Sequence, residues 1–166
     1  MLVLTREDGY ELSSDPRRLD VDRVHHWLST DAYWALGRPR EVLRQAIDGS
    51  WVYGVYAPGD RGQVGFARVI TDGATFGWLC DVYVDRADRG RGLGRWLVGA
   101  IRDHLDGRGV RRILLATWDA HGVYAQVGFN PLADPALWME FDLRKSPVTP
   151  LTGKGSDPEE PLTLTE

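Results

Sequence analysis

The sequence predicts a mixed α/β fold (α+β) with a mostly antiparallel central sheet that carries one parallel strand pair. Two observations support this. Three strand-like runs follow one another with turn signals between them, which is typical of an antiparallel meander. The third run leads through a glycine-rich turn into an amphipathic helix and then into another apolar run. A strand, a helix and a strand in this order imply a right-handed crossover and parallel pairing.

The first fifty residues contribute one short strand and two helices to this prediction. Tyr10–Ser14 is expected to be a strand. Asp20–Ser29 carries apolar residues at helical spacing, with Asp20 placed to cap the helix. Pro39 in a first turn, followed by apolar residues three and four apart, predicts a second helix that ends at Asp48.

The meander occupies the middle of the chain. Trp51–Tyr56 is rich in aromatic and β-branched residues, and the turn signal Pro58–Gly62 separates it from Gln63–Ile70. These two runs are expected to form a hairpin. A second turn at Thr71–Gly73 leads to the third strand, Trp78–Val84.

The last elements complete the crossover. Leu93–Leu105 repeats apolar residues every three to four positions, which predicts a helix with one buried face. Arg112–Thr117 is mostly apolar and is predicted as a strand. Gly122–Val127 is predicted as a short helix, and Leu137–Leu143 as a final strand.

Length and composition favour one domain over residues 1–144. A chain of 166 residues with 43% hydrophobic residues is long enough to bury a core. Residues 145–166 are expected to form a disordered, acidic, proline-rich tail. The net charge of −4 argues against a nucleic-acid partner bound through phosphates. Four carboxylates and one lysine in Ser146–Glu166 account for most of that charge, so the body is nearly neutral.

The cysteine, the histidines and the N-terminal residues argue against disulfides, metal sites and secretion. Cys80 is the single cysteine, so no internal disulfide forms, and its apolar strand predicts a buried structural thiol. His25 and His26 are adjacent and face different sides of a helix, so no metal site is expected. Charged residues appear by position 8, which argues against a signal peptide, and no stretch reaches membrane-spanning length. A cytoplasmic protein without a membrane partner is expected.

The segment Arg89–Gly94, with the sequence RGRGLG, is the strongest chemical signal in the chain. Its three glycines leave backbone N–H groups unobstructed, and a helix N-terminus carries partial positive charge. The turn therefore suits an anion such as a pyrophosphate. The P-loop spacing is absent, and the dinucleotide spacing fails because Arg95 and Leu97 stand where its last glycine is needed. From the turn alone, an anion site and a plain glycine turn both remain open.

Two segments of the chain resemble the signature motifs of the GNAT superfamily of acyl-CoA-dependent N-acetyltransferases. Arg89–Gly94 is similar to its (Arg/Gln)-x-x-Gly-x-(Gly/Ala) motif, and Asp81–Gly90 is similar to the strand-to-turn segment before it. Tyr124–Phe129, with the sequence YAQVGF, resembles its Tyr-x-x-x-Gly-Phe motif. Motif order and spacing agree over about Val21–Leu143.

The resemblance implies the GNAT fold, with helices on both faces of a sheet that splits open between Trp78–Val84 and Arg112–Thr117. It implies acetyl-CoA as the acyl donor and no metal. The pyrophosphate would lie on the amides of the glycine turn, and the pantetheine arm would pair with the backbone of Val82 and Val84. The implied donor-binding residues are Val82, Tyr83, Val84, Arg89, Gly90, Arg91, Gly92, Leu93, Gly94 and Arg95.

The resemblance also implies catalytic roles. Tyr124 would be the acid that protonates the leaving thiolate, and a backbone N–H near Val82 would polarise the thioester carbonyl. The alternative for Tyr124 is a core aromatic residue. Asp81 lies within an otherwise apolar strand, where a carboxylate is costly unless it is paired or functional. It is therefore either the general base, acting through water, or a buried carboxylate bonded to backbone or to an arginine.

Four further residues are candidates for the acceptor pocket. Tyr33 and Trp34 follow the first helix, in a region that overlies the acceptor in this superfamily; packing against the sheet is the alternative. Asp119 is expected to cap the helix that carries Tyr124, and His121 is a secondary base candidate. Many family members carry an Asn here that binds the pantetheine arm, whereas this chain reads Thr117–His121, TWDAH.

These residues predict an N-acetyltransferase that moves the acetyl group of acetyl-CoA to a primary amine of a small molecule. Direct attack in a ternary complex is expected because the single cysteine is expected to be buried. A protein or peptide N-acetyltransferase and a non-catalytic acyl-CoA-binding sensor are the alternatives. Homodimers are common in the family, but no feature of this sequence demonstrates one.

Overall fold

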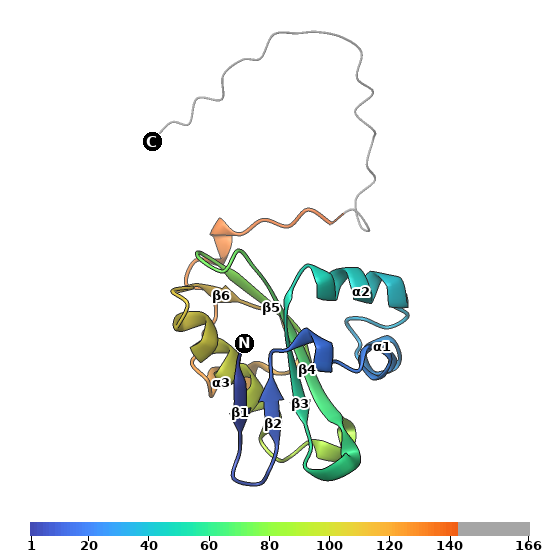
Figure 1. The fold of residues 1–166 in the computed structure, drawn as a ribbon. Coiled ribbons are helices and arrows are strands. Elements are labelled where there is room, and N and C mark those ends of the chain that lie inside the picture. Colours follow the sequence, from blue (N-terminus) through green and yellow to red (C-terminus); the bar gives the residue numbers. More distant parts are fainter. Residues whose placement is uncertain (143–166) are drawn as a thin grey trace. The chain divides into compact units, whose positions relative to one another are not determined.

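A computed structural model describes residues 1–142, and the chain divides into two compact units, Met1–Asn130 and the segment from Pro131 onward. The first unit contains a six-stranded sheet whose strands lie side by side in chain order (Figure 1). Each strand is antiparallel to the next as far as β5, and β5 and β6 are parallel. The strands are β1 (Val3–Thr5), β2 (Glu11–Ser13), β3 (Trp51–Tyr56), β4 (Gln63–Thr71), β5 (Gly77–Val84) and β6 (Ile113–Leu114).

Helices cover both faces of this sheet. Two of them, α1 (Val21–Thr30) and α2 (Arg40–Asp48), lie together on one side, and α3 (Leu93–Asp106) lies on the other (Figure 1). The short α4 (His121–Ala125) follows β6. Asp20 caps α1 by accepting the N–H of Arg23 at 3.0 Å, as the sequence predicts.

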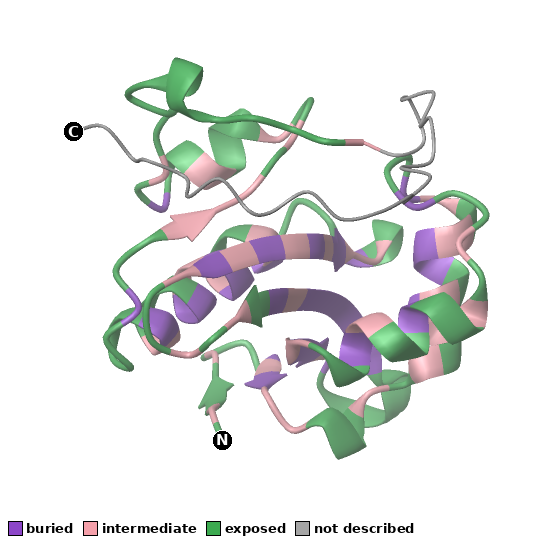
Figure 2. Ribbon diagram, turned by 90° about the horizontal axis from the view of Figure 1, so that it is seen from above, coloured by how far each residue is buried: buried purple, intermediate pink, exposed green. Residues whose placement is uncertain are grey.

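Strand alternation divides the core into two clusters. Successive side chains of a strand point to opposite faces, so Val52 packs with α1 and α2 while Tyr53 and Val55 pack with α3. Figure 2 shows this burial along the central strands of the sheet. The mixed sheet with its one parallel pair and its helices on both faces confirms the fold class expected from the sequence.

A bulge in β5 reverses this alternation. Leu79 packs in the α3 cluster, whereas Tyr83, four residues later, packs in the α1–α2 cluster. An unbroken strand would place both on one face. The register with β4 shifts between Phe66 and Arg68, and Asp81 adopts a left-handed backbone with φ of 53°. Because of this extra residue, Val82 and Val84 pack on the α3 side.

The observed strands differ from the predicted ones in three places. The first strand, β1, was not anticipated, and the strand predicted over Arg112–Thr117 is reduced to Ile113–Leu114. The strand predicted over Leu137–Leu143 is wrong where the structure describes it. A 3-10 turn, η4, covers Pro135–Leu137, and residues 138–142 form no strand. An alternating apolar pattern indicates only which residues could be buried, whereas a strand also needs a partner for its backbone. Leu143 and the expected tail, 145–166, lie outside the described residues.

Candidate functional site

The glycine turn between β5 and α3 presents unpaired amides. Gly90 and Gly92 adopt left-handed backbones, with φ of 77° and 72°, which side-chain-bearing residues rarely adopt. The first residue of α3 whose N–H reaches a helical carbonyl is Trp96, which bonds the carbonyl of Gly92 at 3.0 Å. The amides before it in the first turn of α3 have no carbonyl to reach within the helix. These N–H groups and the helix dipole make the turn suited to bind an anion.

Side-chain hydrogen bonds fix the conformation of this turn. Asp88 is fully buried and accepts hydrogen bonds from the Tyr10 hydroxyl at 2.6 Å and from the Arg61 guanidinium at 3.0 and 2.5 Å. Burial raises the pKa of Asp88, but its bonds to Arg61 and Tyr10 outweigh this and leave the pKa below its usual range. Arg6 donates to the carbonyl of Arg91 at 3.2 Å. The turn is therefore fixed by the protein's own contacts.

A cavity of about 750 Å³, the turn cavity, runs along this segment. It is lined by every donor-binding residue expected from the sequence except Tyr83. The Tyr83 ring points to the other face, where it stacks on Trp27 with centroids 5.3 Å apart and donates to Asp31 at 2.6 Å. Four lining residues were not anticipated, and Gln126 belongs to the second motif, a signal that could have identified it. The four are Asp88, Ala120, Val123 and Gln126.

Within residues 1–142, no strand pairs with the part of the β5 edge that faces the turn cavity. Asp85 donates its N–H to Val64 on β4 at 2.9 Å, so the N–H and C=O of Val84 face the opposite edge. That edge is paired with β6 only at Gly77 and Trp78. The two parallel strands therefore separate before Val84, where the sequence predicts the split. Arg89 donates to the Val84 carbonyl at 2.9 Å, which leaves the N–H of Val84 directed at the cavity side.

Tyr124, on α4, forms part of the wall of the turn cavity. Its ring is half-buried and packs edge-on against Phe129, with centroids 5.9 Å apart. Burial raises the pKa of Tyr124 to about 12, and the nearby Tyr33 and Asp119 add to this rise. The hydroxyl is therefore protonated at neutral pH and able to donate a proton.

Asp81 is held by three side chains. Its Oδ2 accepts from Arg38 and from Arg68, both at 2.6 Å, and its Oδ1 accepts from the Trp34 indole at 3.1 Å. Burial raises the pKa of Asp81, but the two guanidinium groups outweigh it, so the pKa lies below its usual value. Of the two roles considered for Asp81, this geometry fits the buried, paired carboxylate. A base in this position would have to take a proton while bound to two cations.

Tyr33 and Trp34, termed the aromatic link, connect α1 and α2 and meet the loop before α4. Their rings lie perpendicular, with centroids 4.9 Å apart, and are 47% and 44% exposed. The Tyr33 hydroxyl donates to Asp119 at 3.4 Å and accepts the N–H of Trp118 at 3.2 Å. Residues far apart in sequence are thereby brought beside Tyr124.

The expectation that Asp119 caps α4 is wrong. The N-cap position is Ala120, and its N–H is bonded to the Thr117 hydroxyl at 3.1 Å. Asp119 faces Tyr33 instead, because the aromatic link supplies it with a hydroxyl donor. Asp119 and His121 are both exposed beside the start of α4. Cys80 is half-buried, and burial raises the pKa of its thiol to about 11, so it is not a reactive thiolate.

Residues 1–142 contain neither a metal-binding cluster nor a membrane-spanning helix. No three His, Cys, Asp or Glu side chains in this part of the chain are grouped to hold a metal ion. None of its helices has the length and apolar character needed to cross a membrane.

Comparison with known proteins identifies the family. The sequence profile described as the Acetyltransferase (GNAT) family matches residues 21–129. The chain belongs to the GNAT acetyltransferase family. A Gibberella zeae protein described as an acetyltransferase is 36% identical over 133 residues, which cover 69% of this chain and 75% of that protein.

Solved structures agree with this assignment. The crystal structure of a Xanthomonas campestris pv. campestris protein assigned to the GNAT family is 43% identical and has a TM-score of 0.75. The match covers 81% of this chain and 94% of that one. The N-acetylglutamate synthase of Neisseria gonorrhoeae, solved with coenzyme A and N-acetylglutamate, shares the fold with a TM-score of 0.61 at 20% identity. That match covers 75% of this chain and 29% of the synthase.

Proposed function

We propose that this protein transfers the acetyl group of acetyl-CoA to the primary amine of a small molecule by direct attack in a ternary complex. One observation carries the proposal. The turn cavity joins an anion-binding glycine turn, an open strand edge at Val84 and the protonated hydroxyl of Tyr124. A pyrophosphate, an amide-bearing arm and a thioester need these three features in this order.

The turn and the strand edge hold the donor. The amides of Leu93, Gly94 and Arg95 bind the pyrophosphate, and the edge at Val82 and Val84 pairs with the amides of the pantetheine arm. A Cβ added at Gly94 would meet only the Val84 side chain, at 3.9 Å, so the protein itself has room for a larger residue there. Close approach of a ligand explains a glycine that the fold does not need. The coenzyme A bound to the Neisseria synthase supports acyl-CoA use in this fold.

Tyr124 and the bulge in β5 act on the thioester. The acceptor nitrogen forms a bond to the acetyl carbon, and the carbonyl oxygen gains negative charge. A backbone N–H at the bulge beside Val82 stabilises that charge. When the carbon–sulfur bond breaks, Tyr124 gives its proton to the thiolate, and the proton that the nitrogen loses as the amide forms restores the Tyr124 hydroxyl. The ammonium proton must leave before attack, and the exposed Asp119 and His121 are the side chains proposed to receive it.

The aromatic link recognises the acceptor. An amine in its cationic form is attracted to the faces of Tyr33 and Trp34 and to the carboxylate of Asp119. Tyr33 and Asp119 both act on Tyr124, since their charges add to the rise in its pKa. They favour a small cationic amine over a long peptide.

The test is release of CoA from acetyl-CoA with a panel of acceptors. The panel contains aliphatic amines, aromatic amines and short peptides with a lysine or an N-terminal alanine. Turnover with one of the small amines is expected. Turnover with peptides alone would show that the acceptor is a peptide or protein. Tight acetyl-CoA binding without any turnover would identify a sensor.

A further inference from the structure

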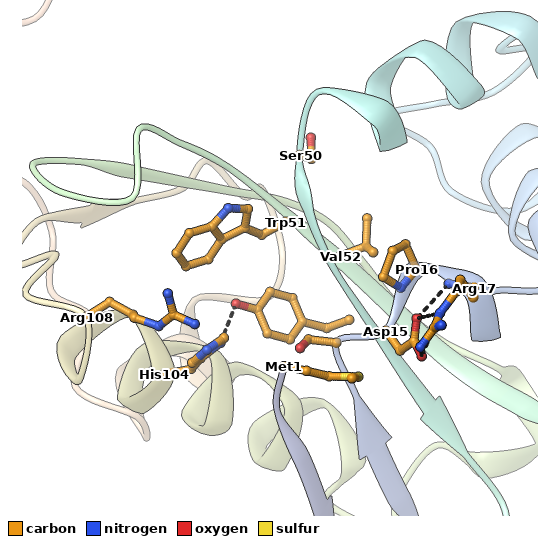
Figure 3. A pocket seen from close by; sticks show the side chains of 11 residues that line it. Met1, Asp15, Pro16, Arg17, Ser50, Trp51, Val52, His104 and Arg108 are labelled. Carbon is orange, nitrogen blue, oxygen red and sulfur yellow. Dashed lines mark hydrogen bonds and ion pairs between the residues drawn. The ribbon is translucent and has the colours of Figure 1, made fainter.

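A second cavity of about 420 Å³ shares no lining residue with the turn cavity. We term it the helix-end cavity, because His104 in the last turn of α3 and Arg108 just beyond it line one side. Figure 3 shows these two residues and Trp51 on one side of the cavity, and Pro16 with Arg17 on the other. The 14 residues of α3 place its two ends about 21 Å apart. The glycine turn lies at the first end.

Three aromatic rings, those of Trp51, Tyr53 and His104, line the helix-end cavity. The rings of Trp51 and His104 lie 5.7 Å apart between centroids, and Tyr53 meets His104 edge-on at 5.9 Å. Val52 and Pro16 add apolar surface. A planar apolar group fits a lining of this kind better than a polar one.

The His104 imidazole is neutral and is hydrogen-bonded to Tyr53. The Tyr53 hydroxyl and His104 Nδ1 lie 3.0 Å apart. Burial, and then the charge of Arg108, lower the pKa of His104, so the imidazole is neutral at neutral pH. When the Tyr53 hydroxyl donates to Nδ1, the ring proton lies on Nε2. The ring then offers one N–H and no vacant acceptor.

The rim of the cavity is positively charged, because Met1, whose ammonium group also acts on His104, lines it together with Arg17 and Arg108. Arg17 is paired with Asp15 at 2.7 Å, so these two charges cancel. The Arg108 guanidinium lies over the Trp51 ring, 5.5 Å from its centroid. No carboxylate of residues 1–142 forms a salt bridge with Arg108.

We propose that the helix-end cavity binds a small aromatic carboxylate, with its ring against Trp51 and its carboxylate on Arg108. A neutral aromatic compound would contact the same rings but would leave the Arg108 guanidinium without an anion. A non-aromatic anion would satisfy Arg108 but leave the aromatic walls in water. The site is separate from acetyl transfer and does not depend on the proposed function.

The test is a titration of the full chain with phenylacetate, in which nitrogen-15 NMR spectra record the indole N–H signal of Trp51. A saturable shift is expected, and saturating CoA should not reverse it. Phenylacetamide, which has the same shape without the charge, should bind about tenfold more weakly or worse, since it cannot form a charged hydrogen bond with Arg108. This comparison needs no variant.

Arg108→Gln should weaken phenylacetate binding by a similar factor. Arg44→Gln, which removes an exposed arginine of α2 outside the cavity, should leave it unchanged. A Trp51 signal that does not saturate, equal binding of acid and amide, or displacement by CoA would each overturn the proposal.

Discussion

The glycine turn takes its six residues from one stretch, Arg89–Gly94, whereas the acceptor side collects residues from distant parts of the chain. Tyr33 and Trp34 follow α1, Asp81 lies in β5, and Asp119 precedes α4. Each region also lies next to a buried carboxylate that is hydrogen-bonded to arginine. Asp88 lies beneath the turn, bonded to Arg61, and Asp81 lies beneath Trp34, bonded to Arg38 and Arg68.

This difference separates two kinds of recognition. Under the proposed function, backbone amides recognise the donor, so a short local sequence is sufficient to specify the site. Side chains would recognise the acceptor, and their positions depend on how α1, β5 and α4 come together. The donor should therefore be sensitive to changes in one segment, and the acceptor to changes at many points. The predictions below test this contrast in order of decreasing effect.

The largest effect is expected for Asp81→Asn. Asn keeps the shape of Asp and tolerates the left-handed backbone, but it leaves Arg38 and Arg68 without their shared anion. The free energy of unfolding should fall by about 3 kcal/mol at pH 7, as for other broken buried ion pairs. Urea unfolding measures this. The control, Asp22→Asn, removes an exposed partner of Arg40 and should cost much less.

Lowering the pH should reduce the difference in unfolding free energy between Asp81→Asn and the unsubstituted protein. The pKa of Asp81 is lowered by folding, so its contribution to stability is present above the unfolded pKa of about 3.9 and is lost as the pH falls through the folded value. The two unfolding free energies should converge below pH ~4. A stable variant that has lost only turnover would instead identify Asp81 as the base.

Tyr124→Phe should lower turnover by about 100-fold or more, the range for loss of a general acid. The affinity for acetyl-CoA should change little, because the ring and its packing on Phe129 remain. CoA release and calorimetry measure the two effects. Tyr56→Phe is the matched control, since that hydroxyl is buried and has no hydrogen-bond partner within residues 1–142. Equal activity of both variants would remove Tyr124 from the chemistry.

Gly94→Ala should weaken CoA binding by about tenfold, equivalent to about 1.4 kcal/mol, because the added methyl group faces the pyrophosphate. Gly99→Ala is the control further along α3, where a Cβ would meet only Val127 at 3.8 Å. Both substitutions should preserve or raise the melting temperature, since Ala favours a helix over Gly. Gly92→Ala is less informative, because a left-handed φ of 72° strains any side chain. Unchanged CoA affinity in Gly94→Ala would contradict the placement of the donor.

Asp119→Asn should raise the KM for a cationic acceptor by about fivefold, with kcat nearly unchanged, as expected for an exposed charge contact of about 1 kcal/mol. The effect should weaken as salt is added. Steady-state kinetics at two ionic strengths measure it. A loss in kcat alone would indicate that Asp119 acts in proton transfer. It would contradict the assignment of Asp119 to acceptor binding.

Sequence patterns predicted the elements whose signals are local. Asp20 identified the start of α1, apolar spacing identified α3, and the glycine turn was correctly located between β5 and α3. Nine of the ten residues expected to contact the donor line one cavity. Tyr83 does not, because the bulge at Asp81 changes which face each later side chain of β5 occupies. No local pattern in that strand distinguishes a bulge from unbroken alternation.

Local sequence patterns were sufficient to predict the meander, the crossover and the glycine turn, since periodicity, glycine and helix capping act within a few residues. The partners of Asp81, the orientation of Asp119 and the contact of the aromatic link with the loop before α4 were set by tertiary contacts. Each depends on contacts between residues more than a dozen positions apart, where the nearest available partner determines the bond. The strand expected at Leu137–Leu143 shows the same limit, because alternation cannot indicate whether a neighbouring strand is there to pair with it.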